Sequence, residues 1–183
     1  MRDGFVLSSI LEVTVPEITL RHEIDTDEDT YWARCVFDVP FNEKMYLGAL
    51  HFPQWKILDS KEDDAKIWRR VQVDPPTGDL PGAVKKVIGD RLSYVEEGTF
   101  DKKTKRYSFK VTPSTLADKT KVAGEMWAEK LGDKKIVRLT RISVEVKVFM
   151  VGGLVEDRIT SDLRSSYDKG TAFTNQYIKE NGL

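Results

Sequence analysis

Cysteine and histidine are scarce in this sequence. Its 183 residues include one cysteine, Cys35, and two histidines, His22 and His51. A single cysteine excludes an internal disulfide, and these three residues do not have the spacing of a metal-binding motif. The glycine-rich loops that bind phosphate and the paired histidines of zinc proteases are also absent from the sequence. We therefore expect neither a metal nor another cofactor.

A surplus of charge is also lacking. The chain has 29 basic and 30 acidic residues, a formal net charge of −1, so the basic excess that is typical of nucleic-acid-binding proteins is missing. The densest basic run, residues 102–106, falls at a predicted hairpin turn, where a solvated turn is favoured over a phosphate site. No apolar run is long enough to span a bilayer, and the N-terminal segment lacks a signal-peptide cleavage site. We expect a cytoplasmic protein without a nucleic-acid partner.

Apolar alternation and turn residues predict seven strands. They are expected over residues 11–24, 54–60, 65–73, 91–101, 106–113, 119–131 and 135–149. Pro16 suggests an edge position or a bulge in the first strand, because proline cannot donate to a ladder. The last six strands are separated by short turns and form three consecutive hairpins, which indicates an antiparallel sheet.

Helices are predicted on either side of these hairpins. Two short helices follow the first strand, over residues 25–38 and 38–50, and the first has Asp25, Thr26 or Asp27 as its cap. A brief helical turn is expected over residues 83–90. Residues 154–181 contain no proline and carry an apolar stripe at three- and four-residue steps, so they form a helix roughly 40 Å long.

The paired glycines Gly152 and Gly153 lie where the last strand meets this helix. The chain must reverse direction there, and glycine permits backbone angles that a sharp corner requires. One face of the sheet must be covered, and the terminal helix is the only predicted element long enough to cover it. We therefore predict an α+β fold in which a curved seven-stranded antiparallel sheet surrounds a long C-terminal helix. Residues 1–10 are interpreted as an N-terminal extension and residues 11–183 as one domain.

This element order, together with the "VGGLVE" junction, resembles the START/polyketide-cyclase-like superfamily, also called SRPBCC or helix-grip proteins. Three stretches are similar to an uncharacterised bacterial branch of that superfamily, and they begin at Phe37, Tyr94 and Val144. The first stretch also resembles the sterol-transfer domains that accompany GRAM domains in eukaryotes. The resemblance implies an internal hydrophobic cavity for a lipid, a sterol, a polyketide or a similar ligand, and it carries over no catalytic motif.

Candidate ligand-binding residues come from the terminal helix, the second short helix and the strands. They are Met45, Tyr46, Leu50, Trp68, Tyr94, Phe109, Trp127, Val146, Ile159, Leu163, Tyr167, Gly170 and Phe173. For any one of them, ordinary core packing is the competing interpretation. Gly170 either leaves room for a ligand or allows a strand to pack closely against the helix.

Residues 45–55 are expected to form the mouth of the cavity, opposite the terminal helix. The proline-rich segment 74–89 is a second candidate gate. Exposed apolar side chains at the mouth would favour a transient contact with a membrane surface. The lysines of the second gate would weakly favour an anionic membrane.

Candidate groups for catalysis are few. Arg69 shares a strand face with apolar residues, and it either points inward, towards Glu96 or a ligand carboxylate, or lies at an edge. Glu125 and Glu145 are solitary carboxylates, either of which could be an inward acid. Cys35 is interpreted as a buried structural residue.

The prediction is therefore a protein that binds, and transfers or senses, a hydrophobic small molecule of the lipid or sterol class. The first alternative is a cyclase or dehydratase that uses the same cavity, and it requires an inward acid or base. The second is a module whose interior is filled by its own side chains and which acts through protein contacts. The volume of the cavity separates this last possibility from the others.

Overall fold

Seven strands form one antiparallel sheet in the computed structural model, which describes residues 17–78, 80–89 and 91–183. The strands are β1 (Glu17–Ile24), β2 (Gln54–Glu62), β3 (Lys66–Asp74), β4 (Tyr94–Asp101), β5 (Arg106–Pro113), β6 (Thr120–Gly132) and β7 (Lys135–Val146). Their order in the sheet is β1-β7-β6-β5-β4-β3-β2, and all neighbours are antiparallel. The predicted fold class and the three hairpins are therefore confirmed.

The first strand, β1, is an edge strand and pairs with β7 from Glu17 opposite Ser143 to Ile24 opposite Ile136. The earlier part of the predicted strand, with Pro16, lies outside the described residues. So does the predicted N-terminal extension, and the division of the chain at residue 11 stays a prediction. No helix in the described part of the chain is long and apolar enough to cross a membrane.

Two short helical segments follow β1, as the sequence predicts. The first consists of α1 (Glu28–Tyr31) and the π-helical turn η1 (Trp32–Val36), and the second of α2 (Val39–Glu43) and the π-helical turn η2 (Lys44–Ala49). Among the three candidate caps, Asp27 is the residue used, because its side chain accepts a hydrogen bond from the Thr30 amide at 2.9 Å. Asp38 caps α2 in the same way.

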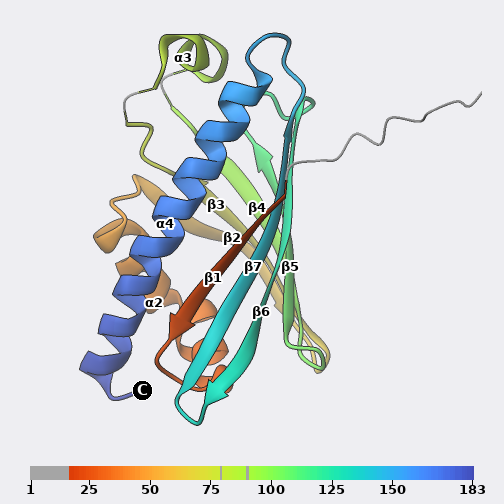
Figure 1. Cartoon of the computed structure of the whole chain (residues 1–183). Coiled ribbons are helices and arrows are strands. Elements are labelled where there is room, and N and C mark those ends of the chain that lie inside the picture. The colour runs from red at the N-terminus through yellow and green to blue at the C-terminus, as the bar shows by residue number, and fades with distance from the viewer. Residues whose placement is uncertain (1–16, 79, 90) are drawn as a thin grey trace, which may run out of the picture.

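The long helix α4 (Gly152–Asn181) runs across the concave face of the sheet, and α3 (Gly82–Ile88) lies near its N-terminal end (Figure 1). The predicted role of the paired glycines is wrong. Neither has a positive φ, and the left-handed residue of the corner is Met150, with φ of 66°. A Cβ on Gly152 would overlap the main-chain oxygen of Val146, whereas Gly153 faces open space. Gly152 therefore serves a close approach between helix and strand.

The buried side chains form three clusters. One lies at the C-terminal end of α4, where Ile178 packs with Phe41 and Phe100. A second lies at the other end of the helix, where Val155 packs with Val84. The third joins β2 and β3 to the segment after η2. Phe109 packs against the first two clusters and Met45 against the first and the third, so the clusters are connected through partly buried side chains.

We expect the two glycines at the corner to respond differently to the same substitution. Gly152→Ala should lower the free energy of unfolding by about 1–3 kcal/mol, because its new methyl group has no room beside Val146. Gly153→Ala should be neutral or stabilise by up to about 1 kcal/mol, because it restricts the unfolded chain without a clash. Urea unfolding of both variants measures this difference, and equal effects would contradict the close approach.

Candidate ligand-binding site

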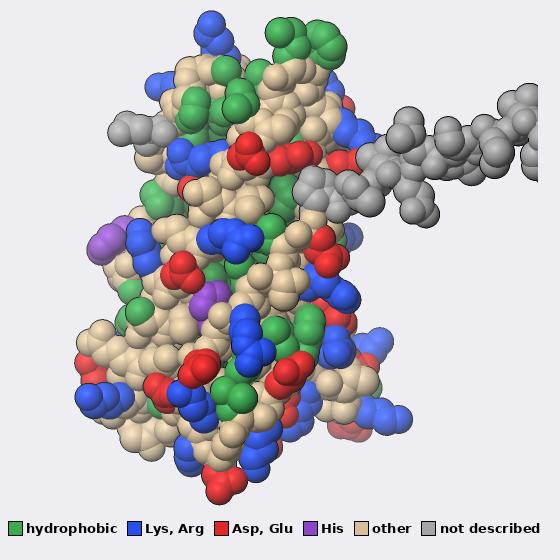
Figure 2. All heavy atoms as spheres, in the orientation of Figure 1, with side chains coloured by type: hydrophobic (Ala, Val, Ile, Leu, Met, Phe, Trp, Pro, Cys, Tyr) green, Lys and Arg blue, Asp and Glu red, His purple; other side chains and the backbone are tan. Residues whose placement is uncertain are grey.

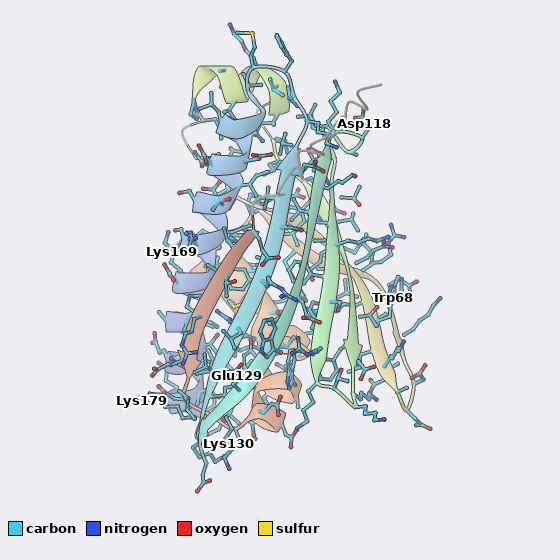
Figure 3. All side chains as sticks on the ribbon, turned by 45° about the vertical axis from the view of Figure 1, so that its right-hand side comes forward. Trp68, Asp118, Glu129, Lys130, Lys169 and Lys179 are labelled. Carbon is cyan, nitrogen blue, oxygen red and sulfur yellow. The ribbon has the colours of Figure 1, made fainter. Side chains whose placement is uncertain are left out.

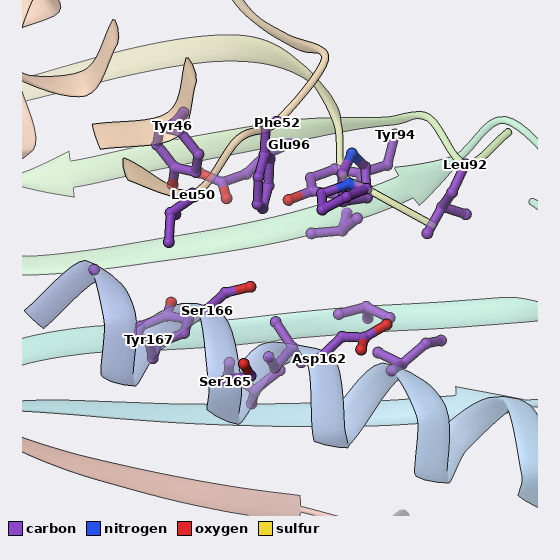
Figure 4. Close-up of a pocket in the computed structure, with 18 of the residues that line it drawn as sticks. Tyr46, Leu50, Phe52, Leu92, Tyr94, Glu96, Asp162, Ser165, Ser166 and Tyr167 are labelled. Atoms are coloured by element: carbon purple, nitrogen blue, oxygen red, sulfur yellow. The ribbon is translucent and has the colours of Figure 1, made fainter. Parts of the chain in front are cut away.

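A cavity of about 450 Å³ lies between the concave face of the sheet and α4. In Figure 4, Tyr46, Leu50, Phe52 and Tyr94 lie on one side, and Asp162, Ser165, Ser166 and Tyr167 of α4 lie on the other. Exposed polar residues of α4 contribute to this wall, so the cavity opens to solvent between the helix and the opposite side. Its volume falls within the range of about 300–1,000 Å³ that is usual for small-molecule sites.

The two ends of the cavity differ in chemistry. The end near α3 is lined mainly by apolar side chains, and Thr77, Arg158 and Asp162 are its polar members. The apolar residues are Leu80, Val84, Ile88, Leu92, Val111, Val122, Ile142, Val155, Ile159 and Leu163. The other end, near η1 and α2, contains the buried Arg138, the partly buried Arg69, a glutamate and several tyrosine hydroxyl groups. A molecule that fills the whole cavity would therefore meet an apolar and a polar environment.

The first polar group centres on Arg69, which points inward from β3. Its Nε donates to the hydroxyl of Tyr107 at 3.1 Å, and its Nη1 donates to the main-chain oxygen of Val36 at 2.8 Å. The Tyr107 hydroxyl in turn donates to Glu96 Oε1 at 2.7 Å. Gly98 makes this arrangement possible, because a Cβ there would overlap the ring of Tyr107. Arg69 thus reaches Glu96 through Tyr107, and it lies on β3, which is not an edge strand.

The second polar group centres on Arg138 of β7. Its Nη2 donates to His22 Nδ1 at 3.0 Å and to Thr171 Oγ1 at 2.8 Å. His22 Nε2 is 2.9 Å from Asp168 Oδ1. His22 is paired with Arg138 across the β1–β7 ladder, and Asp168 and Thr171 belong to α4. This group therefore connects the edge of the sheet to the helix.

Five tyrosines line the cavity, namely Tyr31, Tyr46, Tyr94, Tyr107 and Tyr167. Burial raises the pKa of each hydroxyl above its usual value of 10.0, and it raises the pKa of Tyr46 to about 12. All five hydroxyls therefore keep their protons at neutral pH. They cannot act as bases, and those other than Tyr31 and Tyr107, which donate to Met126 Sδ and Glu96 Oε1, can donate hydrogen bonds to a ligand.

Nine of the thirteen predicted ligand-binding residues line the cavity. They are Met45, Tyr46, Leu50, Tyr94, Phe109, Ile159, Leu163, Tyr167 and Gly170. Gly170 is buried and lines the cavity, and a Cβ there would meet Met45 Sδ at 3.5 Å, so it does not pack closely against a strand. That it leaves room for a ligand stays a prediction.

The other four predicted residues lie elsewhere. Trp68 projects from the outer face of the sheet (Figure 3), with Lys61 Nζ 5.5 Å from its ring centroid. Trp127 also lies outside, between the guanidinium groups of Arg106 and Arg141. Val146 is buried in the core cluster around Val155, and Phe173 packs on Phe41 and Tyr177. Alternation along a strand defines two faces but does not say which of them is inside, and this is why the two tryptophans were misplaced.

The structure also shows where the candidate catalytic residues lie. Glu125 and Glu145 are not inward acids, because Glu125 forms an ion pair with Arg106 at 2.6 Å and Glu145 pairs with Lys147 at 3.1 Å on the outer face. Cys35 is buried, and burial raises the pKa of its thiol to about 12. Its thiolate is therefore rare at neutral pH, as expected of a structural cysteine.

Sequence reasoning missed Arg138. The signal for it was present, because Arg138 shares the alternation of Ile136, Ile142, Val144 and Val146, all of which are buried. A charged residue in register with four apolar ones indicates an inward charge in the same way as Arg69 does on β3.

The charged side chains on the outside are mixed. Acidic and basic groups are interspersed over the face shown in Figure 2. The basic run at residues 102–106 forms the predicted hairpin turn, where Lys102 pairs with Glu62 at 2.7 Å and Lys105 with Asp29 at 2.6 Å. Two of the three lysines of this turn therefore have acidic partners.

Comparison with known proteins identifies the family of this chain. A family model described as "Protein of unknown function (DUF2505)" matches residues 20–178. The chain belongs to the DUF2505 family. A search of curated protein sequences finds no significant match.

Solved structures relate this DUF2505 chain to helix-grip proteins. An aromatase/cyclase (Zhui) from Streptomyces sp. R1128 is 8% identical with a TM-score of 0.66, over 93% of this chain and 97% of that one. A START superfamily protein from Mycobacterium smegmatis is 12% identical with a TM-score of 0.59, over 90% and 97%. Norcoclaurine synthase from Thalictrum flavum is 15% identical with a TM-score of 0.61, over 91% and 88%. The fold of the START/polyketide-cyclase-like superfamily is therefore confirmed, and at these identities the likeness concerns the fold alone.

Because of the buried tyrosines, the free energy of unfolding is expected to decrease at alkaline pH. A hydroxyl whose pKa is higher in the folded than in the unfolded state stabilises the protein below pH 10, and this contribution is lost as the pH rises. For Tyr46 the loss should occur between about pH 10 and about pH 12. We expect the free energy of unfolding, measured in urea, to fall over this window and to fall less steeply in Tyr46→Phe. An unchanged slope in that variant would contradict the burial of its hydroxyl.

Proposed function

We propose that this protein binds a hydrophobic or amphipathic small molecule in the cavity between its sheet and α4, as a carrier or a sensor. The observation that supports this most directly is the cavity itself, with a volume of about 450 Å³ and an apolar end next to a polar one. Burial of apolar ligand surface contributes roughly 25 cal/mol per Å², so a ligand of moderate size would gain enough to bind. The lipid and sterol classes, and transfer between membranes, stay predictions of the same proposal.

A module filled by its own side chains is disfavoured. All four tryptophans lie in the described part of the chain, and none of them lines the cavity. Trp32 and Trp55 belong to the core clusters, whereas Trp68 and Trp127 lie on the outer face. The largest rings of the protein therefore surround the empty volume or lie outside it.

Ligand entry is proposed to occur beside α4. Arg158 Nη2 donates to the main-chain oxygen of Thr77 at 3.0 Å and joins α4 to the proline-rich segment. Tyr46, Leu50 and Phe52 lie across the cavity from α4 (Figure 4). Movement of either segment away from α4 would widen the opening, in agreement with the two gates expected from the sequence.

Contact with a membrane and a cytoplasmic location both stay predictions. The structure adds that Phe149 and Met150 are 90% and 85% exposed in the connection between β7 and α4. This connection lies at the same end of the molecule as α3 (Figure 1). If these side chains made a transient contact with a bilayer, the apolar end of the cavity would lie close to the membrane.

A bulky side chain in the cavity should prevent binding. In Leu163→Trp the indole would occupy the apolar end, and we expect at least a tenfold loss in affinity for the neutral dye Nile red. Leu131→Trp is the matched control, because Leu131 is exposed at the end of β6, and it should bind like the unmodified protein. Native mass spectrometry would identify any lipid that copurifies. Dye binding that is unaffected by Leu163→Trp would locate the site elsewhere and contradict the proposal.

One observation favours an enzyme as the second candidate function. Glu96 is an inward carboxylate, and the hydroxyl that donates to it belongs to Tyr107, whose pKa burial raises. In a dehydration or cyclisation, a carboxylate can accept a proton from carbon while a nearby phenol donates one to the leaving hydroxyl. The aromatase/cyclase shares the fold, and this likeness carries no catalytic residue to the present chain.

Replacement of Glu96 separates the enzyme from the carrier. If the protein catalyses a dehydration, the ligand that copurifies with Glu96→Gln should be heavier by one water than the ligand of the unmodified protein. If the protein is a carrier, both should contain the same molecule, and we expect this second result. High-resolution mass spectrometry of the extracted ligands measures it, with Glu125→Gln on the outer face as the control.

A further inference from the structure

Arg138 combines deep burial with a lack of acidic partners. Its side chain points from β7 towards the cavity, and the residue is 7% exposed. Its Nε is buried and has no hydrogen-bond acceptor among the described residues. Within residues 17–78, 80–89 and 91–183, no carboxylate oxygen lies within 4.0 Å of its guanidinium group. A buried cation in this condition is costly unless something else pairs with it.

None of the groups that contact Arg138 directly is a carboxylate. Nη2 donates to His22 Nδ1 and Thr171 Oγ1, and the guanidinium carbon lies 4.9 Å from the centroid of the Tyr167 ring. Asp168 is reached only through His22, and its side chain is 72% exposed. Water screens such an exposed carboxylate, so it neutralises a buried guanidinium poorly.

Arg69 provides the internal comparison. It also lines the cavity, but its Nε and Nη1 both have acceptors, and Tyr107 joins it to Glu96 inside the same cavity. The positive charge of Arg69 thus has a negative charge beside it in the same poorly solvated space. Arg138 has no such partner, because none of the described carboxylates that line the cavity pairs with its positive charge.

The opposite end of the cavity restricts the rest of the ligand. Val84, Ile88, Val155 and Ile159 give it a mainly apolar lining, and Arg158 at its margin donates to Asp162 and to the main-chain oxygen of Thr77. A ligand that extends from Arg138 to α3 would therefore be anionic at one end and mainly apolar over the remainder. A single unpaired guanidinium matches a single negative charge, and the planar carboxylate is the group that a guanidinium binds through two parallel hydrogen bonds.

We infer that the ligand is an amphipathic monocarboxylate, whose carboxylate pairs with Arg138 and whose apolar body extends towards α3. This inference rests on the proposed function and specifies the class of the ligand. Arg138 is the residue that selects the carboxylate, and its contacts with His22 and Thr171 hold the guanidinium in place. Arg69 remains paired with Tyr107 and is not required for this selection.

Two matched amphiphiles test the inference on the unmodified protein. Dodecanoate and dodecanol have the same chain, and at pH 8 the former carries a carboxylate. Displacement of bound Nile red by each compound is measured at concentrations below micelle formation. We expect dodecanoate to bind at least about tenfold more tightly, as is usual for a hydrogen bond to a charged group. Equal affinities, or displacement by neither compound, would overturn the inference.

Three variants assign the selectivity to Arg138. Arg138→Met should abolish the preference for dodecanoate while leaving the affinity for dodecanol within about threefold. Arg138→Lys should keep part of the preference, because it retains the charge without the planar fork. The control is Arg141→Met, which removes a guanidinium from the outer face of the same strand and should keep the full preference. A full preference in Arg138→Met would overturn the inference. If this variant does not fold, the comparison of the two amphiphiles on the unmodified protein tests the inference instead.

The two proposals fail in different ways. If Nile red does not bind at all, the proposed function itself is contradicted. If Nile red binds to the unmodified protein and is lost from Leu163→Trp, the cavity is a binding site. Absence of a preference for the carboxylate then contradicts only the class of ligand.

Discussion

The structure depends on the way α4 is held at its two ends. Ile178 packs with Phe41 at one end, Val155 packs with Val84 at the other, and the middle of the helix faces the cavity. Because a protein interior is normally close-packed, an empty volume persists only when rigid elements around it cannot collapse. Here the hydrogen-bonded sheet is one rigid wall and the long helix is the other. Gly152 sets the distance between them at the corner where they join.

Inside this frame, the polar groups are arranged in two sets with different balance. Arg69, Tyr107 and Glu96 satisfy one another and can maintain their geometry in an empty cavity. Arg138 is fixed in place by His22 and Thr171 but has no carboxylate of its own nearby. A buried polar network that is complete rigidifies a protein, whereas an incomplete one leaves a polar group that can bind a ligand. One half of the cavity therefore has polar groups that are paired with one another, and the other half has a guanidinium group that is available to a ligand.

Sequence reasoning predicted the architecture well because it rests on long patterns. Seven alternating segments and one proline-free helix allow few arrangements, and the positions of Ile159, Leu163 and Tyr167 on the cavity side follow from helical spacing. Single residues were harder to place. Trp68 and Trp127 lie outside because pairing with Lys61 and Arg106 on the surface suits a large ring as well as burial does. Arg138 shares the alternation of Ile136 and Ile142, but its contact with His22 is a relation between distant segments that local patterns do not contain.

The position of α4 after all seven strands has a consequence for biosynthesis. A ribosome makes the chain from its N-terminus, so the complete sheet emerges before the helix that covers it. During that interval the concave surface, with Val122, Ile142 and Val144, is without its cover, and such exposed surfaces promote aggregation. A small apolar molecule could occupy this surface as soon as the sheet forms. The arrival of α4 would then enclose a guest that was already present.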